Sequence, residues 1–91
     1  MLEKHVQSKI IRYMKSLGAH VINTTKVSPN GTADLLCCLD GRFIAIEVKR
    51  SKKEDLPDIQ TYQIKKVRNA GGISFYAHSV DCVKFNLDYY L

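Results

Sequence analysis

Residues 31–49 read GTADLLCCLDGRFIAIEVK, and the rest of the chain is organised around this stretch. Two apolar runs, residues 35–39 and 43–48, flank the pair Asp40-Gly41. An Asp-Gly pair between strand-like runs is a strong hairpin signal, because both central residues of a type I′ turn need a positive φ. The sequence therefore predicts two antiparallel strands joined by a two-residue turn.

The turn determines which residues lie opposite each other. If Leu39 pairs with Arg42, counting back along both strands places Asp34 opposite Glu47. A three-residue loop would break this register, whereas a four-residue loop from Leu39 to Arg42 would preserve it. Side chains alternate along a strand, so one face is almost wholly apolar and should face the core. It carries Leu35, Cys37, Leu39, Ile44, Ile46 and Val48. The mixed face carries Asp34, Leu36, Cys38, Phe43, Ala45, Glu47 and Lys49.

At one end of the hairpin, the mixed face carries two carboxylates, Asp34 and Glu47, and the amine of Lys49. Directly opposed residues have Cβ atoms about 4.5–5.5 Å apart, and like charges at that distance destabilise a sheet. Two carboxylates at one strand end favour a bound cation, and Mg²⁺ or Mn²⁺ suits oxygen ligands. Lys49 points to the same side, where it can neutralise charge beside the ion or orient a nucleophilic water. The alternative is a salt-bridged, exposed strand end in which Lys49 neutralises one carboxylate.

Size and composition allow one domain with a modest core, residues 1–91. The net charge of +5 suits a polyanionic partner without specifying one. No run has the length of a membrane span, and the N-terminal segment is charged, which predicts a soluble intracellular protein without signal peptide or membrane contact. The three cysteines lack zinc-site spacing and are expected to be buried free thiols.

Hydrophobic periodicity places the remaining elements. Besides the hairpin, we expect helices at residues 2–17 and 56–70 and strands at 20–25 and 73–77. The first helix has the apolar stripe Leu2, Val6, Ile10, Met14 and Leu17. Residues 79–91 are compatible with a short helix, through Val80, Val83 and Leu87, or with an edge strand at residues 82–85. The predicted fold class is α/β (α+β) in the order αβββαβ, with a central mixed sheet flanked by helices. Gln60 would point inward, either to reach the strand end or only to satisfy backbone groups.

Polar residues on either side of the hairpin could serve the same strand end. Lys26 and Ser28 precede it and could contact phosphate, although an ordinary surface loop fits equally well. Arg50, Lys52 and Lys53 follow it and could bind a nucleic-acid backbone, where each neutralised phosphate adds affinity. A solvated loop or a targeting signal are the alternatives for this basic cluster.

This pattern resembles the PD-(D/E)xK nuclease superfamily, whose core is restriction-endonuclease-like, and within it the virus-type replication-repair nuclease (VRR-NUC) family in a stand-alone, single-domain form. The resemblance covers residues 3–77. It is based on Gly31-Thr32-Ala33-Asp34, Ile46-Glu47-Val48-Lys49, Gln60 and Gly71-Gly72. Ala33, Leu56 and Gln63 depart from residues usual in the family, and none of these departures removes a catalytic group.

The resemblance implies hydrolysis of DNA phosphodiester bonds with Mg²⁺ or Mn²⁺ as cofactor. Asp34, Glu47 and the Val48 backbone carbonyl would hold the metal, Lys49 would be the catalytic lysine, and Glu3 or Gln60 would hold the metal's water shell. The process would be DNA repair or recombination, in the cytoplasm of a bacterium or of a phage-infected host.

The predicted substrate is branched DNA. A lone 91-residue domain offers little surface for holding a duplex. We therefore predict a homodimer whose two active sites cut a four-way (Holliday) junction. One alternative is a flap, nicking or restriction-type endonuclease of the same superfamily. Another is a non-catalytic basic DNA-binding module that kept the fold.

Overall fold

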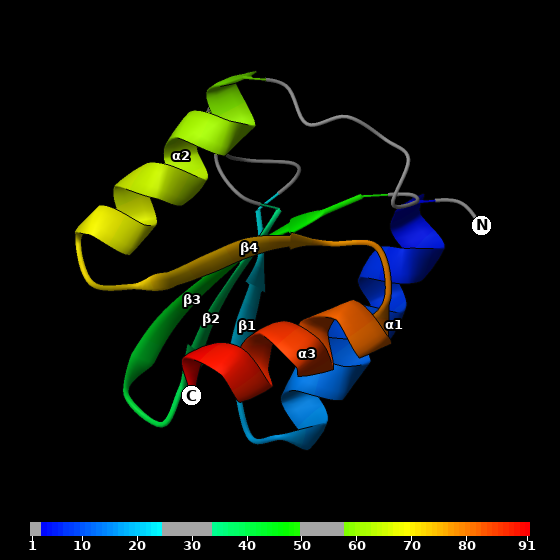
Figure 1. Ribbon diagram of the computed structural model, residues 1–91. Helices are drawn as coiled ribbons and strands as arrows, with labels where there is room; N and C mark the ends of the chain where they lie inside the picture. The colour runs from blue at the N-terminus through cyan, green and yellow to red at the C-terminus, as the bar shows by residue number, and fades with distance from the viewer. Residues whose placement is uncertain (1–2, 25–33, 50–57) are drawn as a thin grey trace.

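Three helices and four strands make up the described part of the chain, residues 3–24, 34–49 and 58–91, in a computed structural model (Figure 1). The elements are α1 (Glu3–Ser16), β1 (His20–Asn23), β2 (Leu35–Leu39), β3 (Arg42–Val48), α2 (Asp58–Asn69), β4 (Ile73–Ala77) and α3 (Val80–Tyr90). The predicted order αβββαβ is confirmed, and α3 extends it. No helix among these residues is long and apolar enough to span a membrane.

The hairpin forms as the turn chemistry requires. β2 and β3 pair antiparallel, with Leu35 opposite Ile46. The turn residues both have positive φ, 52° at Asp40 and 79° at Gly41, as a type I′ turn demands. The two-residue turn and its register are therefore confirmed.

The sheet is mixed, as predicted. Its strand order is β1-β2-β3-β4, with β1 antiparallel to β2 and β4 parallel to β3. Parallel strands need a crossover connection, and α2 lies in the one between β3 and β4. The crossover carries α2 onto the sheet face opposite to α1 and α3.

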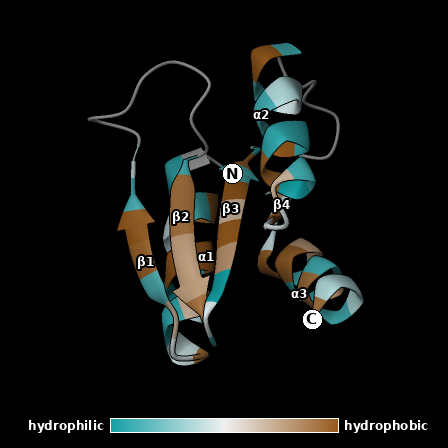
Figure 2. Ribbon diagram, turned by 90° about the vertical axis from the view of Figure 1, so that its left-hand side faces the viewer, coloured by the Kyte–Doolittle hydropathy of each residue, from teal (hydrophilic) through white to brown (hydrophobic). Residues whose placement is uncertain are grey.

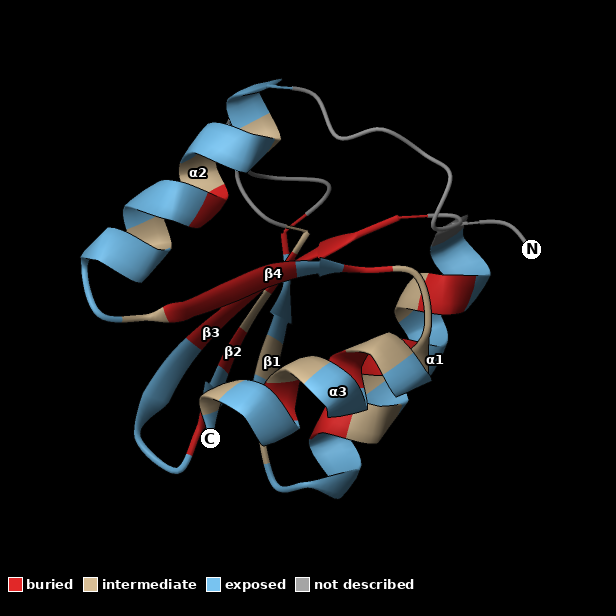
Figure 3. Ribbon diagram, in the orientation of Figure 1, coloured by how far each residue is buried: buried red, intermediate tan, exposed pale blue. Residues whose placement is uncertain are grey.

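The face that holds α1 and α3 is the hydrophobic core (Figure 3). All six residues of the predicted apolar face of the hairpin are buried there. Their partners in the helices and in β4 are Val6, Ile10, Met14, Ile73, Phe75, Ala77, Val83 and Leu87. Burial of these side chains is the main favourable term for the fold, at about 25 cal/mol per Å² of apolar surface.

The opposite face, which we call the site face, is only partly covered. Helix α2 packs over β3 and β4 through the buried Ile64, while Figure 2 shows β1 and β2 with no helix in front of them. Ile22 and Phe43 on this face are 49% and 50% exposed. The site face is thus open beside α2.

Glycine ends both predicted helices in the same way. Gly71 has φ 93° and donates its N–H to the Arg68 carbonyl, and Gly72 donates to the Val67 carbonyl, each at 3.0 Å. This pair of bonds is a Schellman motif, which needs a left-handed residue after the helix. Gly18, with φ 94°, ends α1 with the same motif.

The C-terminal segment, which the sequence left open, is a helix. Ser79 caps α3, because its hydroxyl oxygen accepts a hydrogen bond from the Cys82 N–H at 3.1 Å. Val83 and Leu87 lie one turn apart and are buried against the core. The alternative of an edge strand at residues 82–85 is wrong.

Three details of the burial prediction are wrong. Leu17 was expected in the apolar stripe of α1, but it is 42% exposed because the helix ends at Ser16 and the chain turns at Gly18. Cys38 was expected to be a buried thiol, but strand alternation turns it to the open part of the site face, where it is exposed. Cys82 was also expected to be buried, but it is only partly buried against the core. All three cysteines are free, as predicted.

Candidate active site

Asp34 lies immediately before β2 and is tied to two neighbouring segments. Its backbone carbonyl accepts a hydrogen bond from the Thr24 N–H, and its Oδ2 accepts one from the Val48 N–H, both at 2.9 Å. The first bond continues the pairing of β1 with β2, and the second fixes the carboxylate at the end of β3. A carboxylate has about four lone-pair sites, so Asp34 can keep this bond and still bind a cation.

Glu47 lies near the end of β3 and points to the site face. It is 1% exposed, and its Oε1 accepts a hydrogen bond from Nε2 of Gln60 in the first turn of α2. A buried carboxylate is costly unless it is hydrogen-bonded, so the Gln60 amide is part of what makes this placement tolerable. Of the two alternatives for Gln60, the structure shows the contact with the strand end.

Lys49 follows β3 and extends its pairing with β4. Its N–H donates to the Ala77 carbonyl at 2.8 Å, and its side chain is buried, with 6% exposed. The Nζ atom lies 4.5 Å from the centroid of the Tyr76 ring. An ammonium group over an aromatic face is attracted by the ring's quadrupole, so this contact restricts the orientation of a long, flexible side chain.

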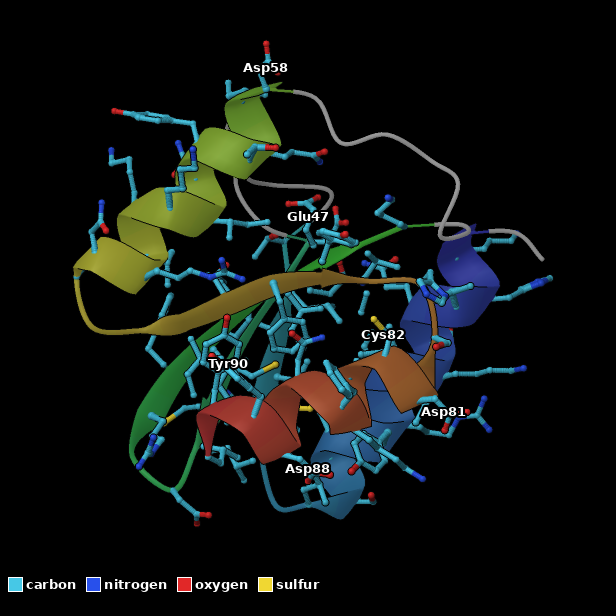
Figure 4. All side chains as sticks on the ribbon, in the orientation of Figure 1. Glu47, Asp58, Asp81, Cys82, Asp88 and Tyr90 are labelled. Carbon is cyan, nitrogen blue, oxygen red and sulfur yellow. The ribbon has the colours of Figure 1, made fainter. Side chains whose placement is uncertain are left out.

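The cavity next to Glu47 is lined mostly by apolar side chains. Figure 4 shows Glu47 at the end of the sheet next to α2, whereas Asp81 and Asp88 lie on α3, away from it. A cavity of about 220 Å³ adjoins the glutamate between α2 and the sheet. It is lined by Leu36, Phe43, Ala45, Glu47, Gln63, Ile64, Val67 and Ser74. In such surroundings charges interact more strongly than in water.

The donors at this strand end suit a hard divalent cation. No three His, Cys, Asp or Glu side chains gather into a metal cluster within residues 3–24, 34–49 and 58–91. Asp34 and Glu47 instead offer two carboxylates from opposed strand ends, and the Val48 carbonyl follows in the chain. These donors are all oxygen, and Mg²⁺ usually keeps several waters, so the set fits Mg²⁺ or Mn²⁺.

Several predicted site residues belong to segments outside the described part of the chain. Lys26, Ser28, Arg50, Lys52 and Lys53 lie outside the described residues. Glu3 begins α1, and its side chain lies outside the described part of the structure.

A solved structure described as a VRR_NUC domain has the same architecture. It is similar to this chain with a TM-score of 0.84 and 24% sequence identity, over 98% of this chain and 97% of that one. The chain has the fold of a VRR_NUC domain. No protein-family model matches its sequence, and no curated protein does. The fold class predicted from the hairpin and the element order is therefore confirmed by a structural neighbour.

Within this VRR_NUC fold, the structure adds a residue that sequence reasoning missed. Tyr76 lies beside Glu47 in the parallel β3–β4 ladder and contacts Lys49. The aromatic character of β4 was visible in the sequence. Its register against β3 was not, because the long connection through α2 leaves the pairing of the two strands undetermined.

Proposed function

We propose that the chain is a single-domain, divalent-metal-dependent endodeoxyribonuclease of the VRR-NUC type, spanning residues 1–91. One observation carries the proposal. The Asp34 and Glu47 side chains converge on the same end of the hairpin, where Gln60 hydrogen-bonds Glu47 and Lys49 is buried alongside. Acidic and basic groups buried together beside an open face are typical of a reaction centre.

The metal would be Mg²⁺ or Mn²⁺, held by Asp34, Glu47 and the Val48 carbonyl, with Glu3 acting through water. When bound, the ion would polarise the phosphate and lower the pKa of a coordinated water. Gln60 would fix the orientation of the Glu47 carboxylate through the bond that the structure shows. A ligand held in this way spends less time in unproductive orientations.

Lys49 would act on the phosphate itself. Its ammonium group would stabilise negative charge that develops on the phosphate oxygens, or position the attacking water. Its burial supports this role, because a cation removed from bulk water acts more strongly on a nearby charge.

DNA is the proposed substrate. The net charge of +5 favours a polyanion. Lys26, Ser28, Arg50, Lys52 and Lys53 would contact its backbone from the two segments that flank the hairpin. We further propose branched DNA such as a four-way junction, cut by a homodimer during repair or recombination inside a bacterial or phage-infected cell.

The exposed face of α3 supports association with a second copy. Phe85 and Tyr89 lie one turn apart there and are 72% and 76% exposed. An antiparallel pairing of two α3 helices centred on Asn86 would put Lys84 of one copy opposite Asp88 of the other. Because α3 lies on the core side of the sheet, this dimer would leave both site faces open to DNA.

The deciding experiment uses end-labelled DNA substrates: a four-way junction, a 5′ flap, a linear duplex and a single strand. Purified protein is incubated with each in Mg²⁺ or Mn²⁺, with EDTA controls and the variants Asp34→Asn and Lys49→Ala. We expect paired symmetric cuts in the junction, abolished by EDTA and reduced about a hundred- to a thousandfold in both variants. Circular dichroism checks that the variants are folded.

The other outcomes separate the alternatives. Cleavage of the flap or the duplex instead would keep the nuclease and discard the junction resolvase. DNA binding without cleavage under any metal condition would make the chain a DNA-binding module. A monomer in gel filtration with light scattering would remove the homodimer, and Phe85→Ser with Tyr89→Ser should convert a dimer to a folded monomer.

A further inference from the structure

Tyr76 is placed beside the proposed catalytic lysine by the sheet itself. In the parallel β3–β4 ladder Tyr76 is the register partner of Glu47, and Lys49 extends the ladder by donating its N–H to the Ala77 carbonyl. Residues 47, 49 and 76 all point to the site face because side chains alternate along both strands. The tyrosine is 45% exposed, so it is not there to fill the core.

The Tyr76 ring contacts the Lys49 ammonium group and restricts its position. Its side chain is 6% exposed, and its Nζ atom lies 4.5 Å from the centroid of the Tyr76 ring. A cation–π contact is stronger when the cation is shielded from water, which is the situation of this ammonium group. Lysine has four flexible carbons, and the ring selects one of their many arrangements.

We propose that Tyr76 is a positioning residue of the active site, whose ring holds the Lys49 ammonium group at the end of β3 ready for the phosphate. The carboxylates of Asp34 and Glu47 lie at the same strand end and would otherwise draw the ammonium group toward themselves. The uncharged ring attracts the ammonium group without forming an ion pair with either carboxylate. This inference rests on the proposed nuclease function.

The experiment compares Tyr76→Phe, which keeps the aromatic face, with Tyr76→Leu, which keeps bulk but removes it. Tyr62→Leu is the matched control, because Tyr62 is also exposed and lies under a lysine, Lys66, at 5.4 Å. The single-turnover cleavage rate and the Kd for DNA without metal are measured for each variant. We expect Tyr76→Leu to slow cleavage about tenfold with unchanged Kd, and the other two variants to stay within about twofold.

A spectroscopic measurement tests the contact independently of activity. In the free protein the aromatic ring should shift the Lys49 Hε resonances upfield, in the wild type and Tyr76→Phe but not in Tyr76→Leu.

If the wild type cuts no DNA, the proposed function falls, and the inference that depends on it falls too. If the wild type cuts DNA and Tyr76→Leu cuts it equally fast, the positioning role is overturned while the nuclease stands. A slow Tyr76→Phe variant would also overturn it, in favour of the hydroxyl group, and so would an unshifted Lys49 in the wild type.

Discussion

Ile46 and Glu47 are neighbours on β3, and their side chains point to opposite faces of the sheet. They are 0% and 1% exposed, so both are buried, but their side chains contact different kinds of residue. Ile46 lies in an apolar core closed by α1 and α3, whereas Glu47 meets the amide of Gln60 at the edge of a partly open face. An apolar side chain gains free energy by burial, and a carboxylate loses it.

The difference separates stability from proposed activity. The core face supplies the free energy that keeps the chain folded. The site face holds a group whose burial costs free energy, and such groups concentrate at functional sites. Substitutions on the two faces should therefore affect different measurements, even when the residues are adjacent in the chain.

The largest expected effect is on the core face. Ile46→Ala removes three carbons from a fully buried site and should lower the free energy of unfolding by about 2–5 kcal/mol, measured by urea denaturation. Ile46→Val is the graded control, with an expected loss of about 0.5–1.5 kcal/mol. A loss below about 1 kcal/mol for the alanine variant would mean that this face is not the source of stability.

The next effect is on the site face. Glu47→Gln keeps the shape of the side chain and an oxygen that can accept the Gln60 hydrogen bond, so the free energy of unfolding should change by about 1 kcal/mol or less. Loss of the carboxylate charge should nevertheless slow DNA cleavage at least about a hundredfold, since even the loss of a ligand's hydrogen-bond partner can cost that much. The measurement is single-turnover cleavage in Mg²⁺.

Two results would contradict the role proposed for Glu47. Unfolding of the glutamine variant would show that the carboxylate is structural. Cleavage at the wild-type rate in a folded variant would show that Glu47 is not a metal ligand. Ile46→Val, which should stay folded and cut normally, is the reference from the other face.

The sequence could predict those features of the two faces that depend on local chemistry. The pair Asp40-Gly41 admits a type I′ turn, and that turn alone determined the register, the apolar face and the approach of Asp34 to Glu47. Gly71 likewise indicated the end of α2. In each case a residue type is tied to a backbone conformation within a few residues.

What sequence could not predict depends on contacts between distant segments. The register of β4 against β3 placed Tyr76 next to Glu47, and no local signal determines a register across a helical crossover. The segment that forms α3 is short enough to fit two periodicities, and the cap at Ser79 decides between them. Gln60 was predicted to point inward, but only the packing of α2 on the sheet shows that it meets Glu47.

A smaller effect on metal binding is expected from Gln60, which also lies on the site face. Gln60→Leu removes the donor to Glu47 and should weaken Mn²⁺ binding about tenfold, measured by isothermal titration calorimetry. Gln63→Leu is the matched control on the same helix, because Gln63 lines the cavity next to Glu47. Equal losses in both variants would attribute the effect to the cavity instead of the hydrogen bond.

The last prediction changes neither stability nor cleavage, and it tests the two faces through adjacent thiols. Cys37 points into the core and Cys38 to the open part of the site face. Burial raises the pKa of the Cys37 thiol to about 11, so at pH 8 only about one molecule in a thousand carries the reactive thiolate. A thiol reagent followed by mass spectrometry of the peptides should therefore label Cys38 quickly and Cys37 hardly at all.

Because the pKa of the Cys37 thiol is raised, the rate of its reaction should increase as the pH rises toward 11. A fast reaction at Cys37 and a slow one at Cys38 at pH 8 would mean that the strand is turned over by one residue, which would exchange the two faces and remove Glu47 from the site.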